Sequence, residues 1–468
     1  MEGLDCLQSP SQLQFKTMQA EKKYSYWFNT GIYSFLQRMS VLFFGIASFS
    51  VLARALSTDH MGIWAHFLAL TANIELLRWA IVKSAFIKYL SVHHHEANDE
   101  IITAALVLNI VVTGLIAVLI LLFMPALSGF LKAPGLTRTM YIFLFGLIFL
   151  IPFSHFEWIQ NSQGDFRGVF IAYMVRQGSW FLLMVAHLLI FGKISVFHLA
   201  IYYSVGIFIG SIVAYRYVRK YLNRKSIFVK EWFMKLWRYG RIIMGSSFSV
   251  MVFKNVDQMM VSNIISLTAV AIYNVALRIR NLLDMPSYVI GDIMFPKSAQ
   301  EHAKDNKERL REMYEKSVGV VLAIILPGGL LILLLPKFIL AILAGQKYLG
   351  AAFIVRLMLI NSIFGAFIKQ FGTIMDSTGK AKLNFAVTTM MALMSIVLCY
   401  FFTKKLGLPG AVLGIILTSL AGFCVSQYYL NKYYRIRFWK AFGHAFRFYP
   451  EMLEIVKARV ILKWKASF

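Results

Sequence analysis

Long apolar runs separated by short polar segments dominate this chain of 468 residues. Each run has about the 20 residues that an α-helix needs to cross a bilayer. The pattern therefore predicts an all-α, polytopic membrane protein with about twelve transmembrane helices. We expect these spans at residues 29–56, 61–88, 101–127, 138–160, 168–191, 195–218, 240–264, 268–296, 317–344, 348–375, 382–403 and 409–431.

One of these runs, Tyr273 to Pro296, carries four charged residues, which are Arg278, Arg280, Asp284 and Asp292. A charged side chain facing lipid at membrane depth costs at least ~2.5–3.5 kcal/mol. We therefore expect these side chains to face the protein interior or a water-filled passage, with the other spans acting as its scaffold.

Composition supports the membrane interpretation, because 59% of the residues are hydrophobic whereas a soluble domain has about 45–50%. The 48 Lys and Arg against 22 Asp and Glu give a formal charge of +26. Such a basic balance can indicate nucleic-acid binding. Here the positive charge lies in short segments between apolar runs, which is the pattern of membrane topology. We expect no nucleic-acid partner.

Basic residues gather in alternate connections, chiefly at 216–241, at 297–316 and after 432. Short loops rich in Lys and Arg stay in the cytoplasm, so both termini are predicted to be cytoplasmic. The N-terminal segment lacks the pattern of a cleaved signal peptide, and the first span is expected to serve as the insertion signal. The three cysteines form neither a disulfide framework nor a metal-ligand spacing.

The second half of the chain weakly repeats the first. Residues 56–65 resemble 265–274, and NSQG at 161–164 resembles DSTG at 376–379. Two six-helix halves that both begin in the cytoplasm predict a parallel repeat, with a central cavity between the halves. The expected segments are a cytoplasmic N-terminal segment (1–28), two six-helix halves (29–218 and 240–431), an amphipathic linker (219–239) and a basic amphipathic cytoplasmic tail (432–468).

The linker region mixes basic residues with Trp232, Phe233 and Trp237, and the tail has a similar composition. Both patterns are typical of helices that lie on an anionic membrane surface. Membrane lipids are thus expected partners. For the tail, a solvated basic connector is an equally good interpretation.

Three pairs of opposite charge lie three or four residues apart within spans: Glu75 with Arg78, Lys254 with Asp257, and Arg280 with Asp284. Residues at this spacing are neighbours on one helical face. Two interpretations stay open. The pairs either lock helices together, or they line the wall of the cavity.

Basic residues outnumber acidic ones at these depths, which favours a cationic cavity for an anionic ligand such as a phosphate. The predicted substrate-binding residues are Arg38, Arg78, Lys83, Lys254, Arg278 and Arg280. The predicted ion-coupling residues are Glu75, Asp257 and Asp284. Later spans of each half also carry Arg176, Arg356 and Lys369, which we expect nearer the membrane interfaces.

Other motifs are weaker. A metal site at His93–His95 is less expected than a solvated polar loop, and no metal or other cofactor is expected. His155 and Glu157 suit a proton relay or an interhelical contact. Pro286 predicts a bend in its helix. There is no Gly-rich phosphate loop, zinc-ligand spacing or nucleophile elbow, so we do not expect an enzyme.

Several segments resemble the polysaccharide flippases of the multidrug/oligosaccharidyl-lipid/polysaccharide exporter superfamily. The resemblance runs from about residue 25 to 435. Its motifs are RAL at 54–56 leading into MGIW at 61–64, NSQGDFR at 161–167, YG at 239–240 with Asp257, AIYNVALRI at 271–279 and FPKSA at 295–299.

This resemblance implies a bacterial inner-membrane transporter for surface polysaccharide biosynthesis. Its substrates would be oligosaccharide repeat units linked to polyprenyl diphosphate. It would carry them to the outer leaflet by alternating access, with coupling to H⁺ or Na⁺. A polysaccharide polymerase and other assembly proteins are expected partners. The alternatives are an ion-coupled multidrug or cation antiporter of the same superfamily and a membrane enzyme of polysaccharide assembly, which would need a long extracytoplasmic loop.

Overall fold

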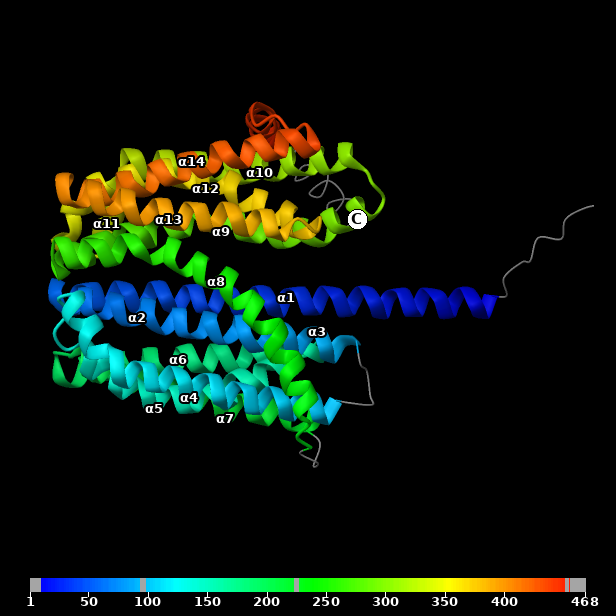
Figure 1. Cartoon of the computed structure of the whole chain (residues 1–468), viewed down its shortest axis with the longest axis horizontal. Coiled ribbons are helices and arrows are strands. Elements are labelled where there is room, and N and C mark those ends of the chain that lie inside the picture. Colours follow the sequence, from blue (N-terminus) through cyan, green and yellow to red (C-terminus); the bar gives the residue numbers. More distant parts are fainter. Residues whose placement is uncertain (1–9, 93–97, 223–226, 451–453, 455–468) are drawn as a thin grey trace, which may run out of the picture. The chain divides into compact units, whose positions relative to one another are not determined.

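The structure is a computed structural model that describes residues 10–92, 98–222, 227–450 and 454. All regular structure within these residues is helical (Figure 1). In chain order the helices are α1 (Pro10–Ala55), α2 (Thr58–Arg78), η1 (Trp79–Lys83), α3 (Ser84–Val92), α4 (Asn98–Phe130), α5 (Leu136–Ser162), α6 (Phe166–Phe191), α7 (Val196–Val218), η2 (Arg219–Tyr221), α8 (Lys230–Ile264), α9 (Leu267–Ala303), α10 (Lys307–Leu334), α11 (Pro336–Leu343), η3 (Gln346–Ala351), α12 (Ala352–Ser377), α13 (Ala381–Leu406) and α14 (Leu408–Tyr434).

Within the described residues, ten helices are long and apolar enough to cross a membrane by length and composition. They correspond to ten of the twelve predicted spans. The other two predicted spans are α8 and α9, the helices in which charged residues interrupt the apolar sequence. The all-α fold with about twelve membrane helices is therefore confirmed, and its two polar helices stand next to each other in the chain.

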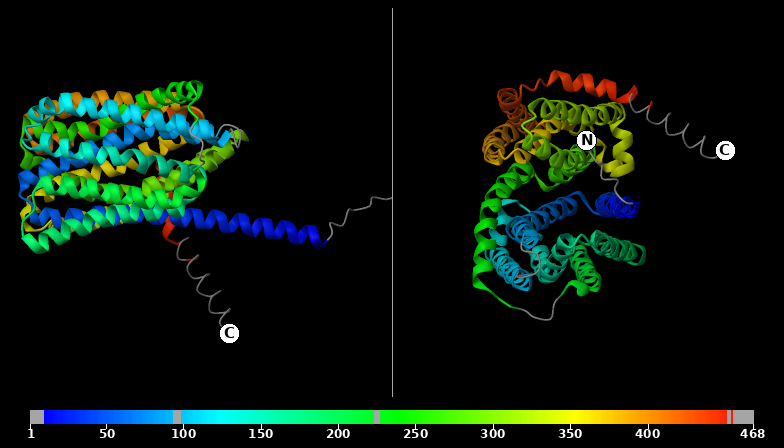
Figure 2. Two further views of the ribbon diagram at one scale, coloured as in Figure 1. Left: turned by 90° about the horizontal axis from the view of Figure 1, so that it is seen from below. Right: turned by 90° about the vertical axis from the view of Figure 1, so that its right-hand side faces the viewer.

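The chain divides into two compact units. Unit 1 contains residues 1–48, 78–124 and 138–241, and unit 2 contains residues 49–77, 125–137 and 242–468. Within each unit the long helices run alongside one another (Figure 2). These units are not the two halves expected from the sequence repeat, because two stretches of the first half, 49–77 and 125–137, cluster with the second. The boundaries of the six-helix halves stay a prediction.

Backbone geometry supports the sequence repeat. Six glycines have positive φ among the described residues, and they follow helices in the same order in both halves: Gly135, Gly164 and Gly192, then Gly345, Gly379 and Gly407. Only glycine adopts this conformation without steric cost, so it commonly ends helices. Gly164 and Gly379 are the last residues of the NSQG and DSTG segments that the sequence comparison aligned.

Asp165 links the loop after α5 to the start of α6. Its side chain accepts the Gly168 backbone N–H at 3.2 Å as an N-cap and forms an ion pair with Lys220 at 2.8 Å. Burial by itself raises the pKa of Asp165, but the hydrogen bonds from Lys220, from the Gly168 N–H and from Tyr221 outweigh it and lower the pKa. The carboxylate thus stays ionised and stabilises the turn between α5 and α6 through its bonds to Gly168 and Lys220.

The linker and the tail differ in their surroundings. Residues 230–239 of the expected linker are the first turns of α8, where Trp232 is buried and donates to Glu100 at 3.0 Å. The prediction of a lipid contact for Trp232 is therefore wrong. In the tail, the helix at 439–450 exposes Trp439 and Phe446, and its contact with lipid stays a prediction.

The start of α2 packs against the start of α9 within unit 2. A Cβ added at Gly62 would overlap the backbone carbonyl group of Leu267. Thr268 donates a hydrogen bond to Asp59 at 2.5 Å beside this contact. Because the obstacle is backbone, a larger residue at Gly62 cannot be accommodated by turning a side chain.

We predict that Gly62→Ala separates α2 from α9 and lowers the free energy of unfolding by about 1–3 kcal/mol, the usual cost of overpacking. Thermal unfolding in detergent measures it. The control is Gly114→Ala on α4, where nothing lies within 4 Å of the added Cβ, so stability should stay equal or rise by up to ~1 kcal/mol. Equal melting temperatures for the two variants would contradict the close contact.

Candidate functional site

Arg78 is buried in unit 1 at the end of α2, with 1% of its surface exposed. Its Nε donates to Thr113 at 2.9 Å, and its Nη2 donates to Asn109 at 2.7 Å, to Ser154 at 2.9 Å and to the Leu150 carbonyl oxygen at 3.1 Å. These partners belong to α4 and α5. Arg78 therefore joins three helices through hydrogen bonds, which is the helix-locking role that the sequence left open.

A π-helical turn, η1, follows Arg78 directly and ends at Lys83. In an α-helix, residues five apart point about 140° away from each other. The i→i+5 hydrogen bonds of a π turn bring them to one face. Arg78 and Lys83 consequently both reach α5, where Lys83 Nζ lies 2.7 Å from Glu157 Oε1.

Glu157 is nearly buried and accepts hydrogen bonds from several donors. Besides Lys83, Asn161 Nδ2 donates to Oε1 at 3.1 Å and the Tyr173 hydroxyl donates to Oε2 at 3.0 Å. His155 is buried on the same helix, and the Arg176 guanidinium lies 6.0 Å from the Tyr173 ring centroid. An anionic substrate that binds Lys83, as predicted, would therefore have to compete with the Glu157 carboxylate.

Unit 2 contains the other predicted charged residues of the seventh and eighth spans. Arg280 Nε lies 3.1 Å from Asp284 Oδ2, so the predicted pair forms. The Arg278 guanidinium stacks on the Phe49 ring at 4.8 Å from its centroid. Lys254 is exposed, while Asp257 is buried and accepts hydrogen bonds from the Tyr273 hydroxyl and from the Gln258 backbone N–H. Asp257 thus pairs with Tyr273 and not with Lys254.

The remaining predicted residues lie on separate helices. Arg38 is exposed on α1, and Glu75 is half-buried on α2. Arg38 belongs to unit 1 and Glu75 to unit 2. Arg356, on α12, is exposed and donates to the Leu333 carbonyl oxygen at 3.3 Å. The histidine run at 93–95 lies outside the described residues.

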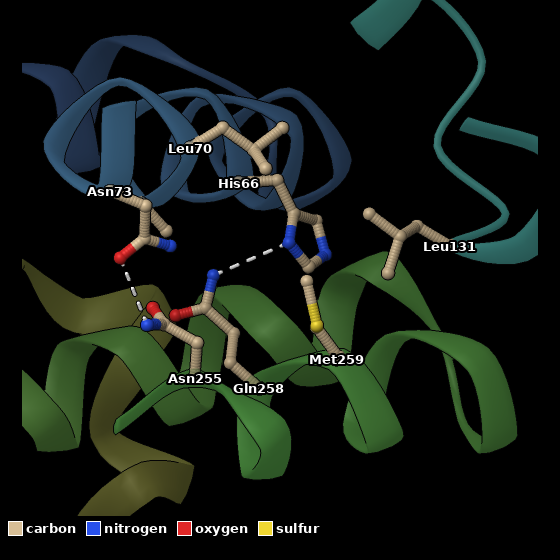
Figure 3. Close-up of a pocket in the computed structure, with 8 residues that line it drawn as sticks. His66, Leu70, Asn73, Leu131, Asn255, Gln258 and Met259 are labelled. Carbon is tan, nitrogen blue, oxygen red and sulfur yellow. Dashed lines mark hydrogen bonds between the residues drawn. The ribbon is translucent and has the colours of Figure 1, made fainter. Parts of the chain in front are cut away.

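A small pocket between α2 and α8 is lined by polar side chains together with apolar ones such as Leu70, Leu131 and Met259 (Figure 3). Asn255 donates to Asn73 at 3.2 Å, and Gln258 Nε2 lies 3.4 Å from His66 Nδ1. His66 Nε2 also lies 2.8 Å from Ser262 Oγ. These contacts join α2 to α8 through amide and imidazole groups, which a sequence search for charge did not single out.

Helix α9 is not one of the ten apolar membrane-length helices of the described residues, and exposed polar residues lie along one of its faces. Asn281, Tyr288 and Asp292 are exposed, and their spacing of seven and four places them on one face. An adjoining side of the helix is buried, with Ser287 and Gly291 against α12. Exposed polar groups at membrane depth require water or protein rather than lipid beside them.

Comparison with known proteins gives the same architecture. The model of a family described as "Polysaccharide biosynthesis protein" matches residues 28–302, and the MatE family model matches residues 243–401. The "Putative O-antigen transporter" of Shigella flexneri is 24% identical over 376 residues, which are 79% of this chain and 89% of that protein.

A Methanocaldococcus jannaschii protein described as "Uncharacterized membrane protein MJ1068" is 23% identical over 307 residues, or 65% of this chain. That match spans only 54% of the archaeal protein.

Two solved structures share the fold. An inward-facing multidrug resistance transporter of the MATE family has a TM-score of 0.72 and 16% identity, covering 86% of this chain and 98% of its own. The lipid II flippase MurJ, in an inward closed conformation, has a TM-score of 0.73 and 14% identity, covering 90% of both chains.

Fold and sequence together define a multi-pass membrane transporter of the multidrug/oligosaccharidyl-lipid/polysaccharide exporter superfamily. Within it, this chain belongs to the polysaccharide biosynthesis protein family, whose model covers more than half of its length. The resemblance drawn from the sequence motifs is confirmed.

We predict that Lys83→Met and Glu157→Gln each lower the free energy of unfolding by about 1–3 kcal/mol, because each leaves a nearly buried polar partner unsatisfied. The double variant should lose less than the sum of the two, as expected for residues in direct contact. Thermal unfolding of the four proteins in detergent measures this. Strictly additive losses would show that the ion pair adds nothing.

Proposed function

We propose that this protein is a flippase for oligosaccharide repeat units linked to polyprenyl diphosphate. It carries them by alternating access from the cytoplasmic to the outer leaflet of a bacterial inner membrane, for surface polysaccharide biosynthesis. The polysaccharide family match and the O-antigen transporter relative support the pathway. A polysaccharide polymerase and other assembly proteins are the proposed partners.

The exposed polar face of α9 is the observation that carries this proposal. A helix with Asn281 and Asp292 exposed at membrane depth borders an aqueous path rather than lipid. Arg278 and Arg280 lie on the same helix, and Lys254 is exposed on α8. Because Arg and Lys bind phosphates through charge-assisted hydrogen bonds, a path with these residues suits an anionic diphosphate.

Ion coupling completes the proposed mechanism. Asp284 is held by Arg280, so an anionic substrate that attracts the guanidinium loosens the carboxylate for H⁺ or Na⁺. Glu75 and Asp257 are the other proposed coupling carboxylates. Each of the three would bind the ion directly through its oxygens, and no resident cofactor is proposed.

The MatE family match favours a second candidate, an ion-coupled antiporter for cationic drugs. Its substrates are positively charged, so they would be repelled by the basic residues above. A membrane enzyme is a weaker alternative, since the short connections between the described helices leave little room for a catalytic domain.

We predict that Arg278→Ala lowers the rate of transport of a lipid-linked saccharide at least about tenfold, because a charge-assisted hydrogen bond to phosphate contributes about 1.5–3 kcal/mol. Reconstituted liposomes with a fluorescent polyprenyl-diphosphate saccharide measure the rate, with and without imposed pH and Na⁺ gradients. Arg356→Ala is the matched control. An unchanged rate for Arg278→Ala, or efflux of ethidium in place of lipid transport, would contradict the proposal.

A further inference from the structure

Two exposed lysines, Lys254 and Lys369, lie beside the exposed ring of Tyr288, and the three residues come from different helices of unit 2. The Lys369 Nζ on α12 lies 4.8 Å from the Tyr288 ring centroid, and the Lys254 Nζ on α8 lies 5.9 Å from it. All three residues are exposed, with 43% of the Tyr288 surface accessible. We call them the Tyr288 cluster.

The depth of the cluster argues against a lipid environment. Lys254 lies near the middle of the predicted span at 240–264, and Tyr288 and Lys369 lie in the last third of the predicted spans at 268–296 and 348–375. A lysine that faces hydrocarbon at such depth costs several kcal/mol unless it reaches water or a polar partner. Two of them at one tyrosine therefore indicate water or a polar ligand at this place.

The charges of the cluster point to an anion. Two ammonium groups beside one ring repel each other, while each is attracted to the ring face. Asp376 acts on Lys369 electrostatically, but among the described residues no carboxylate forms an ion pair with Lys254 or Lys369. A phosphate group between the two nitrogens would relieve the repulsion and accept hydrogen bonds from both.

The ring of Tyr288 adds a second recognition element. The face of an aromatic ring carries negative charge density, which attracts polarised C–H groups such as those on one side of a pyranose. A saccharide attached directly to a diphosphate would place a sugar ring within reach of Tyr288 while its phosphates lie at the lysines. Neither lysine alone would distinguish a glycosylated diphosphate from a bare one.

We propose that Lys254, Tyr288 and Lys369 form a subsite for a diphosphate-linked saccharide, in which the lysines bind the diphosphate and the Tyr288 ring stacks on the first sugar. This subsite rests on the proposed function. It adds that residues of unit 2 bind the diphosphate and the first sugar of the substrate. Tyr288 and Lys369 are then binding residues in addition to Lys254.

Binding to the purified full-length protein in detergent tests the subsite. The probes are citronellyl diphosphate carrying one N-acetylglucosamine, inorganic pyrophosphate, and free N-acetylglucosamine. Lys254→Gln and Lys369→Gln should each weaken binding of both diphosphates about tenfold or more. Tyr288→Leu should weaken binding of the glycosylated probe while leaving pyrophosphate nearly unchanged, and Tyr288→Phe should bind both as the wild type does.

The matched control uses a similar pair elsewhere. On α13, Lys404 Nζ lies 5.9 Å from the ring centroid of Tyr400, which is 50% exposed. Lys404→Gln and Tyr400→Leu should therefore leave binding unchanged. Melting temperatures equal to the wild type, together with normal binding by Lys254→Arg, would exclude misfolding as the cause of a loss.

Wild-type binding by Lys254→Gln and Lys369→Gln, or an equal loss of both diphosphates in Tyr288→Leu, would overturn the subsite. Transport in liposomes is measured separately on the same variants. If the wild type binds the glycosylated probe through the cluster but moves no lipid-linked saccharide, the proposed function fails and the subsite stands. If transport is normal in all cluster variants, the subsite fails and the function stands.

Discussion

The structure depends on one physical constraint, which is that a charged or strongly polar side chain at membrane depth needs a polar partner or water. Arg78 has polar partners through hydrogen bonds to two neighbouring helices, and the partner of Lys83 is Glu157. Where such groups are satisfied internally, they hold helices together. Where they are exposed, as on α9, they mark a surface that lipid cannot cover.

The two units use this constraint differently. In unit 1 the polar groups of α2, η1 and α5 are buried and mutually hydrogen-bonded, so removing one weakens the packing. In unit 2 the exposed residues of α9 are joined by Lys254 of α8 and Lys369 of α12. The proposed binding of an external anion therefore involves unit 2, while Arg78 and Lys83 of unit 1 have internal polar partners.

The sequence predicted the all-α fold and most helix positions, while the two six-helix halves stay a prediction. The weak repeat behind them agrees with the positive φ of Gly164 and Gly379, where the chain leaves a helix. The sequence also predicted the Arg280–Asp284 pair, since residues four apart always share a helical face. These features depend only on local spacing or on membrane thickness.

Other features depend on contacts between helices, which spacing does not contain. The π turn after Arg78 changes the register of Lys83, so its partner Glu157 could not be read from α-helical periodicity. Asp257 was expected near Lys254 but is buried against Tyr273, and Trp232 was expected at the lipid surface but contacts Glu100. Tyr288 is an ordinary residue in the sequence and gains importance only from the two lysines beside it.

Cysteine accessibility along α9 tests the central claim most directly. In a protein whose native cysteines are replaced by serine, single cysteines are placed at Asn281 and Tyr288 on the exposed face, at Ala276 on the packed face, and at Val397, an exposed apolar position of α13. A membrane-impermeant maleimide should label 281 and 288 in membranes, but not 276 or 397. Unlabelled cysteines at 281 and 288 would contradict an aqueous path along α9.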